Sequence, residues 1–198
     1  MEDIDAIMEI SLLARDIGRK EGKRPRIGVS VAGFVPKPHT PFQWEAQAAE
    51  EDLAMKGGIL KRSAKRAGIV LNYHEPTQTF LEGVLARGDR RIADAIEKAW
   101  RDGARFDGWT ECFDGGRWMR AFADAGIDPT EYTGRTRGRD EAFPWEVIDT
   151  GVSRSFLWAE RIKALTGELT LDCRGGACNL CGWQERDCPV LEATNGKG

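Results

Sequence analysis

The sequence predicts an α/β protein in which helices alternate with parallel strands, followed by a helical extension and a cysteine-rich segment. Two short stretches with strand character, 26–34 and 69–73, are each preceded by a segment with helical periodicity. Neither stretch is followed by a turn that would form a hairpin. The order helix, strand, helix, strand with short connections is typical of parallel sheets.

The first helix is predicted from an apolar face that recurs at steps of three and four residues: Ile7, Ile10, Ala14 and Ile17. A polar run ends this helix, and Pro25 prevents its continuation. The strand predicted over 26–34 alternates branched apolar residues with small ones. Its small face allows a ligand or a second backbone to approach closely.

Helices account for most of the remaining elements that the sequence predicts. We expect a second helix over about 45–66, weakened in its middle by the pair Gly57 and Gly58. The second strand, 69–73, follows it directly. Beyond Pro76 the apolar spacing predicts several further helices, and Asp89 is the expected N-cap of one of them.

Composition and charge bound the class of protein. The chain has 198 residues, 41% of them hydrophobic and 31% charged, which is typical of a globular domain. With 29 basic and 32 acidic residues the net charge is -3, so the overall balance does not favour nucleic-acid binding. The acidic start is unlike a signal peptide, and no apolar run is long enough to cross a bilayer, which predicts a cytoplasmic protein.

Four of the five cysteines lie near the end of the chain with the spacing C-x4-C-x2-C-x6-C: Cys173, Cys178, Cys181 and Cys188. The two-residue spacer lets two thiolates reach one metal ion at about 2.3 Å, so the four cysteines are candidate ligands. Zinc is the first candidate, and an iron–sulfur cluster is the second, because the spacing is similar to ferredoxin patterns. The remaining interpretation is reduced, unligated thiols. Cys112 stands alone and is predicted to be a small apolar residue.

The loop that follows the first strand carries candidate site residues. Three prolines make the backbone of 35–41 stiff and extended. Lys37 and His39 lie just past the end of the first predicted strand, and His74 lies just past the second. In parallel α/β barrels this end of the strands carries the active site, so all three are candidates for contacts to substrate or cofactor. The alternative is that they are hydrogen-bonded loop residues that help to position Phe42 and Trp44 in the core.

Two arginine-rich segments are candidates for binding phosphate. Their side chains are Arg87, Arg90, Arg91, Arg135, Arg137 and Arg139. The alternative interpretation is a solvated, charged face without a ligand.

The proline loop reads Phe34-Val35-Pro36-Lys37-Pro38-His39-Thr40-Pro41-Phe42-Gln43-Trp44, a combination too specific to arise readily by chance. Further motifs follow in order: Ala86-Arg87-Gly88-Asp89-Arg90-Arg91, Phe106-Asp107-Gly108-Trp109, Phe143-Pro144-Trp145, Gly151-Val152, Asp172-Cys173-Arg174 and Cys178-x2-Cys181-Gly182. Together they resemble an uncharacterised family of radical S-adenosylmethionine (radical SAM) enzymes that often carries a cobalamin-binding-like N-terminal domain. The resemblance covers nearly the whole chain.

The resemblance implies three parts: the end of a partial (β/α) radical SAM barrel in 1–76, a helical extension in 77–168, and a cysteine-rich metal knuckle in 169–198. Radical SAM enzymes hold a [4Fe–4S] cluster on a C-x3-C-x2-C loop, and the cluster cleaves S-adenosylmethionine to a radical that abstracts hydrogen from the substrate. This sequence has no such loop. We therefore expect the cluster-bearing half elsewhere, on the same or a separate chain, and no catalysis by these residues alone.

Two functional hypotheses follow from these observations. The first is a portion of a radical SAM enzyme whose substrate, by resemblance to neighbouring families, is RNA or a ribosomal component. The second is a stand-alone zinc-knuckle module that binds RNA or protein without catalysis. The knuckle also departs from the family, which tends to place another cysteine soon after Cys181, whereas here Cys188 comes later.

Overall fold

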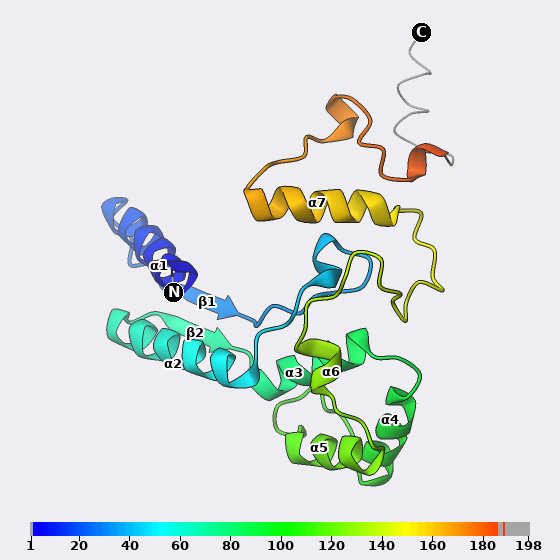
Figure 1. The fold of residues 1–198 in the computed structure, drawn as a ribbon. Coiled ribbons are helices and arrows are strands. Elements are labelled where there is room, and N and C mark those ends of the chain that lie inside the picture. The colour runs from blue at the N-terminus through cyan, green and yellow to red at the C-terminus, as the bar shows by residue number, and fades with distance from the viewer. Residues whose placement is uncertain (1, 186–187, 189–198) are drawn as a thin grey trace.

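Figure 1 shows a computed structural model of the chain, which describes residues 2–185 and 188. The described residues form helices and two strands in this order: α1 (Glu2–Lys20), β1 (Gly28–Val31), η1 (Pro41–Trp44), α2 (Glu50–Ala67), β2 (Val70–Tyr73), α3 (Pro76–Arg87), α4 (Ile92–Arg101), α5 (Gly115–Asp124), α6 (Thr130–Thr133), α7 (Arg154–Thr166), η2 (Cys173–Gly175) and η3 (Trp183–Glu185). The three η elements are short 3-10 helices. The chain is thus mixed α/β but mostly helical.

The two strands pair side by side and in parallel, as the sequence predicts. The register runs from Gly28 opposite Val70 to Val31 opposite Tyr73. The first strand is shorter than the predicted 26–34, because its partner ends at Tyr73 and a proline-rich loop follows. Within the described residues this pair is the whole sheet, so the α/β class is observed and a barrel is not.

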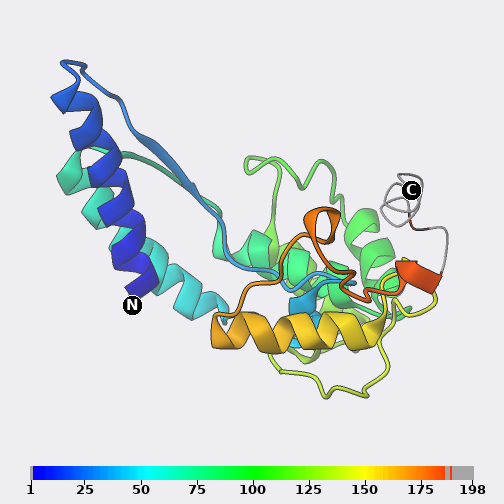
Figure 2. The same cartoon turned by 90° about the horizontal axis from the view of Figure 1, so that it is seen from above.

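We call α1, β1, α2 and β2 the arm, and α3 to α7 the body. Figures 1 and 2 show the arm projecting to one side of the body. The apolar stripe predicted on α1 is left uncovered, with Ile10 68% and Ile17 53% exposed. Val70 of β2 is also 49% exposed. Parallel sheets normally lie buried between helices, so the arm presents apolar surface that a folded protein usually covers.

Helix α2 differs from its prediction at both its start and its middle. It begins at Glu50 rather than near 45, because η1 forms first and Glu45 returns to extended geometry. It continues without a break through Gly57 and Gly58. A side chain at position 57 would collide with the ring of Tyr73, so the glycine allows α2 to lie close against β2.

Helix α3 begins at Pro76, because proline suits the first turn of a helix. The prediction of Asp89 as the N-cap of α4 is wrong. The helix starts at Ile92, and the Asp89 Oδ1 atom accepts the backbone N–H of Arg91 at 2.9 Å. Asp89 therefore closes a turn ahead of the helix.

The body contains two groups of buried side chains. The first lies among α3, α4, α5 and α6 and consists of Leu81, Val84, Ile92, Ala95, Ala99, Ala104, Trp118, Ala121, Phe122, Ile127 and Tyr132. The second, which we call the aromatic group, consists of three aromatic residues and one leucine: Trp44, Phe143, Trp145 and Leu157. The Trp44 ring meets Trp158 edge to face with centroids 5.0 Å apart, and Phe143 stacks on Trp145 at 4.7 Å. This aromatic group anchors the end of the proline loop to the body, where the sequence placed Trp44.

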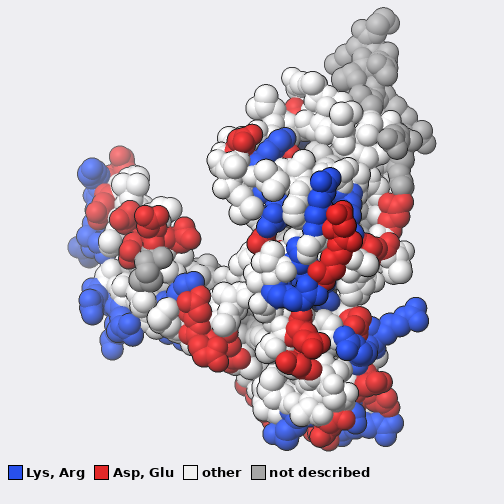
Figure 3. Space-filling model, viewed as in Figure 1, with Lys and Arg blue, Asp and Glu red and all other residues white. Residues whose placement is uncertain are grey.

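No helix of the described residues has the length and apolar character needed to cross a membrane. Figure 3 shows basic and acidic side chains gathered next to each other in the middle of the body, between α6 and α7. Two of the ion pairs there join Arg135 to Glu141 and Arg154 to Glu146. The basic side chains are therefore partly neutralised within the chain.

Candidate functional site

A cavity of about 710 Å³ opens at the carboxyl end of β2, where the arm meets the body. Its lining comes from β2, α3, the loop after α4, and α5: Asn72, Tyr73, His74, Glu75, Gln78, Thr79, Leu81, Glu82, Leu85, Asp107, Gly108, Thr110, Phe113 and Trp118. The volume is in the range of about 300–1,000 Å³ that is typical of small-molecule sites. Apolar and polar groups both face it, as ligand recognition requires.

His74 reaches this cavity because of its place in the sheet. Its backbone N–H donates to the carbonyl of Val31 at 3.1 Å and so continues the ladder one residue beyond β2. The side chain is exposed and lines the cavity together with Glu75. His74 thus lies at the carboxyl end of β2, and its contact to a substrate or cofactor stays a prediction.

Lys37 approaches the same cavity through an ion pair. Gln78, Glu82 and Leu85 follow one another on α3 at helical spacing and face the cavity. The ammonium group of Lys37 contacts the carboxylate of Glu82. The loop after β2 therefore lines the cavity directly, whereas the loop after β1 reaches it through the contact of Lys37 with Glu82.

Asp107 lines the same cavity and is a candidate site residue that the sequence motifs alone do not single out. Its Oδ2 atom accepts the indole N–H of Trp118 at 3.3 Å, whereas Oδ1 is buried and has no hydrogen-bond partner among the described residues. A buried carboxylate oxygen without a donor is costly, and a ligand in the cavity can supply one. The motif Phe106-Asp107-Gly108-Trp109 was the available signal, together with the left-handed backbone of Phe106 at φ 57.

His39 does not join Lys37 and His74. Its backbone N–H donates to the Oε1 atom of Gln43 at 3.1 Å, and the same oxygen accepts the indole N–H of Trp145 at 2.9 Å. The residue takes a left-handed conformation at φ 56, and its Nε2 atom is buried without a partner among the described residues. His39 therefore belongs to the turn above the aromatic group and is not part of the cavity lining.

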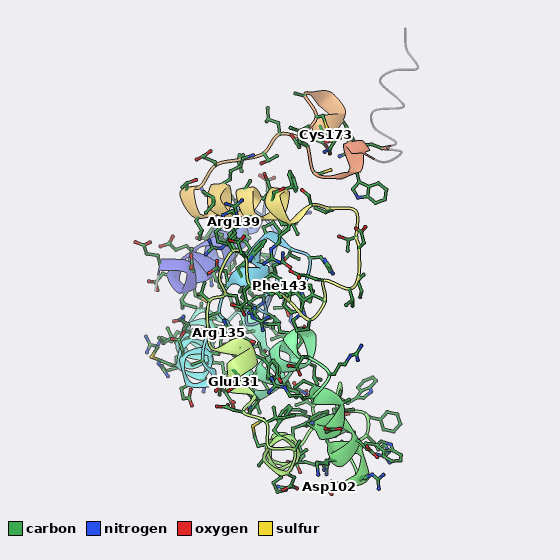
Figure 4. The ribbon with its side chains drawn as sticks, turned by 45° about the vertical axis from the view of Figure 1, so that its right-hand side comes forward. Asp102, Glu131, Arg135, Arg139, Phe143 and Cys173 are labelled. Carbon is green, nitrogen blue, oxygen red and sulfur yellow. The ribbon has the colours of Figure 1, made fainter. Side chains whose placement is uncertain are left out.

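A second cavity of about 490 Å³ lies beside α6 and contains three of the predicted arginines: Arg91, Arg135 and Arg137. Arg137 is 6% exposed, and its Nε atom finds no hydrogen-bond partner within the described part of the chain. Figure 4 shows Glu131 and Arg135 close together at α6, with Phe143 above them. We call this cavity the arginine pocket.

Arg87 lies behind the arginine pocket and is fully buried. It donates to the carbonyl oxygens of Tyr132 at 2.8 Å and Glu45 at 2.7 Å, and its Nη2 atom has no partner among the described residues. Burial, and then the nearby charge of Arg137, lower the pKa of Arg87 to about 10. Burial likewise lowers the pKa of Arg137.

The cysteine-rich segment docks onto the start of α7. The backbone N–H of Ser153 donates to the carbonyl of Cys181 at 2.7 Å, and Gly182 packs against the backbone of Gly151. Asn179 closes the loop by donating from its side chain to the carbonyl of Leu171 at 2.9 Å. The segment is thus attached to the body.

The four cysteines predicted as metal ligands are unpaired and partly exposed: Cys173, Cys178, Cys181 and Cys188. Within residues 2–185 and 188, no group of three or more His, Cys, Asp and Glu side chains is arranged to hold a metal ion. Residues 186–187 and 189–198 of the predicted knuckle lie outside the described part of the chain. Cys112, predicted as a small apolar residue, is exposed in the loop after α4.

Comparisons with known proteins place few limits on the function. No family model matches the chain, and no solved structure matches it significantly. The uncharacterized protein MJ0966 of Methanocaldococcus jannaschii is 29% identical over 98 residues, which cover 48% of this chain and 20% of that protein. The aligned part thus spans about a fifth of the length of this curated relative, whose name states no function.

Proposed function

We propose that the chain is a C-terminal part of a radical SAM enzyme, which supplies late strands of the barrel and one wall of its active site. One observation carries the proposal. The loops that leave two adjacent parallel strands reach the same cavity, one through the ion pair of Lys37 with Glu82 and the other through His74. In α/β barrels the active site lies at this end of the strands.

The uncovered surface of the arm supports an incomplete barrel. The backbone N–H and C=O groups of successive residues in a strand point to opposite sides. The carbonyls of Ile27 and Val31 accept hydrogen bonds from the side of β2. The backbone N–H and C=O groups of Gly28 and Ser30 therefore point to the other edge of β1. Together with the exposed stripe of α1, this edge is a surface to which a preceding strand and helix can add.

Within this proposal the chain contributes binding groups, and the cluster-bearing half contributes the cofactors. A [4Fe–4S] cluster on that half would bind S-adenosylmethionine and supply the radical chemistry. Asp107 offers an acceptor with an unpartnered oxygen, and His74 offers a donor or acceptor at the strand end. These side chains would orient the substrate, which by resemblance to neighbouring families is RNA or a ribosomal component.

The cysteine-rich segment is proposed to brace the body as a metal loop. Its spacing and its docking onto Ser153 support this role, although the described side chains are not arranged around a metal. Metal analysis with absorption spectroscopy separates zinc from an iron–sulfur cluster, and the absence of both would remove this part of the proposal. Replacement of Cys178 by serine should lower the metal content, whereas Cys112→Ser, outside the segment, should not.

The enzyme proposal is tested with the complete protein, in which the segment carrying C-x3-C-x2-C is expressed together with residues 1–198. We expect 5′-deoxyadenosine to form from S-adenosylmethionine under reducing conditions, and none to form with residues 1–198 alone. Asp107→Asn should lower the substrate-dependent yield by about tenfold or more, because the cavity loses its charged acceptor. Asp102→Asn is the matched control, since Asp102 is exposed at the far end of the body (Figure 4).

Either of two results would contradict the proposal: cleavage of S-adenosylmethionine by residues 1–198 alone, or a native protein that lacks any cluster loop. The second candidate function, a zinc-knuckle module that binds RNA or protein, predicts binding to generic RNA that weakens steeply with salt. A flat salt response would remove the RNA form of that alternative. The arginines already paired with carboxylates, such as Arg135, leave fewer free charges for a broad RNA surface.

A further inference from the structure

Arg137, which lines the arginine pocket, and Arg87, which lies behind it, do not use their full hydrogen-bonding capacity within the described part of the chain. Arg87 and Arg137 are both more than nine-tenths buried, and neither forms a described ion pair with a carboxylate. Each has one nitrogen without a hydrogen-bond partner among the described residues, namely Nη2 of Arg87 and Nε of Arg137. Buried guanidinium groups in globular proteins are normally matched by acceptors. A hydrogen-bond acceptor on a bound ligand could pair with these nitrogens.

The aromatic group supports the Arg137 side chain from one side. Its guanidinium lies 5.3 Å from the ring centre of Trp145 and 5.5 Å from that of Phe143. Its backbone N–H donates to the carbonyl of Trp44 at 2.8 Å, which fixes the chain at this position. Because rings and backbone hold the residue in place, little conformational entropy is lost when a ligand binds to it.

The carboxylate of Glu141 shows which groups of the pocket bind an oxyanion. Its carboxylate accepts two hydrogen bonds from the Arg135 guanidinium, at 2.8 and 2.5 Å, and one from the backbone N–H of Gly138 at 3.3 Å. These contacts, above all the one with Arg135, lower the pKa of Glu141 to about 2. The contact with Arg135 is on the exposed side of the pocket, where a stronger oxyanion can compete for the same guanidinium.

Arg91, the third arginine of the lining, forms an ion pair that can rearrange. Arg91 forms a two-pronged ion pair with Asp89, and the hydroxyl of Tyr132 donates to the same carboxylate at 3.2 Å. The Arg91 side chain is 62% exposed, so this pair contributes little to stability and can rearrange. Arg91, Arg135 and Arg137 thus surround one cavity of about 490 Å³.

We propose that the arginine pocket binds the phosphate group of a small ligand, between Arg137 and Arg135, with Glu141 as the internal competitor. Forked guanidinium groups match the geometry of phosphate oxygens better than single ammonium groups do. A buried, preorganised Arg137 favours one phosphate group over the spaced phosphates of an RNA backbone. The inference does not depend on radical chemistry, and its failure would leave the proposed enzyme function intact.

Calorimetric titration of the full chain with inorganic phosphate, at constant ionic strength set with NaCl, tests the site. We expect saturable binding that Arg137→Lys weakens by about tenfold or more, because a forked contact to a charged group is lost. Arg135→Gln, which changes a half-exposed side chain and leaves the core intact, should weaken it similarly. Glu141→Gln should strengthen binding several-fold, because it removes the competing charge.

Arg101→Gln is the control, since Arg101 is an exposed, ion-paired arginine at the end of α4, away from the pocket. It should bind phosphate like the unmodified chain. Absence of phosphate binding in both the unmodified chain and Glu141→Gln would overturn the proposal, as would an equal loss in Arg101→Gln and Arg135→Gln. Salt-sensitive binding of single-stranded RNA that phosphate does not displace would assign these arginines to nucleic acid and also overturn it.

Discussion

The side chain of Gln43 accepts a hydrogen bond at 2.9 Å from the indole N–H of Trp145, a residue 102 positions further along the chain. Gln43 ends the proline loop, and Trp145 belongs to the aromatic group of the body. The direction in which the chain leaves β1 is therefore fixed by residues that follow much later in the sequence. The same chain segment carries Lys37, which contacts Glu82 of α3 in the cavity lining.

Replacement of Trp145 by phenylalanine tests this contact. The ring stack on Phe143 is retained in part, whereas the buried oxygen of Gln43 loses a donor. We expect the free energy of unfolding to fall by about 1–2 kcal/mol. Chemical denaturation measures it, and Trp100→Phe, at an exposed position on α4, should change it by less than about 0.5 kcal/mol. Equal losses of unfolding free energy in both variants would show that the hydrogen bond does not contribute measurably to stability.

Adjacent glycines in α2 should respond oppositely to alanine. At position 57 a new Cβ would lie 2.5 Å from the Tyr73 ring, which is held by its hydroxyl on the carbonyl of Leu53. Gly57→Ala should therefore destabilise the chain by about 2 kcal/mol. Gly58→Ala meets only the flexible end of Arg62 and should stabilise it by up to about 1 kcal/mol. Thermal denaturation of both variants checks the pair, and stabilisation by both would contradict the close packing of α2 on β2.

Arg87 is expected to be structurally important although it is charged. Arg87→Ala removes two hydrogen bonds to the carbonyls of Tyr132 and Glu45 and leaves a void in the core, so stability should fall by about 3 kcal/mol or more. Arg90→Ala, three residues later and exposed, should cost less than about 0.5 kcal/mol. Urea denaturation of the two variants gives the comparison. A loss below 1 kcal/mol for Arg87→Ala would mean that its desolvation offsets both bonds.

Glu141 should make stability depend on acidic pH in a defined direction. Its pKa is lowered in the folded chain from 4.5 to about 2. The stabilisation is therefore complete above the ordinary value and is lost as pH falls through about 2. The difference in unfolding free energy between the unmodified chain and Glu141→Gln should stay constant near neutral pH and shrink below about pH 4.5. Denaturation across this range measures it, and a difference that grows on acidification would refute the pairing with Arg135.

The sequence predicts the parallel pair and most helices well, because their signals are local. Alternation of apolar and small residues identifies β1, and apolar spacing identifies α1. Boundaries fail where tertiary contacts decide them: η1 displaces the start of α2, since Trp44 is drawn into an aromatic group formed with Phe143 and Trp145. Those partners lie about a hundred residues away, and no local pattern reveals them.

The candidate site is predicted only in part for the same reason. The positions of His74 and Lys37 are predictable because both residues follow strands; His74 lines the cavity, whereas Lys37 contacts Glu82 of its lining. Asp107 was missed, since its role depends on α5 folding back toward α3, which gives it Trp118 as a partner. The same rule applies to His39, but its backbone N–H is bonded to Gln43 and the residue does not line the cavity.

Amide hydrogen exchange at β1 tests the incomplete barrel most directly. In residues 1–198 alone, the amides of Gly28 and Ser30 face an unpaired edge and should exchange quickly, whereas those of Val29 and Val31 face β2 and should be slower. In complex with the cluster-bearing half, we predict strong protection of Gly28 and Ser30. Unchanged fast exchange at these two amides in the complex would contradict the account.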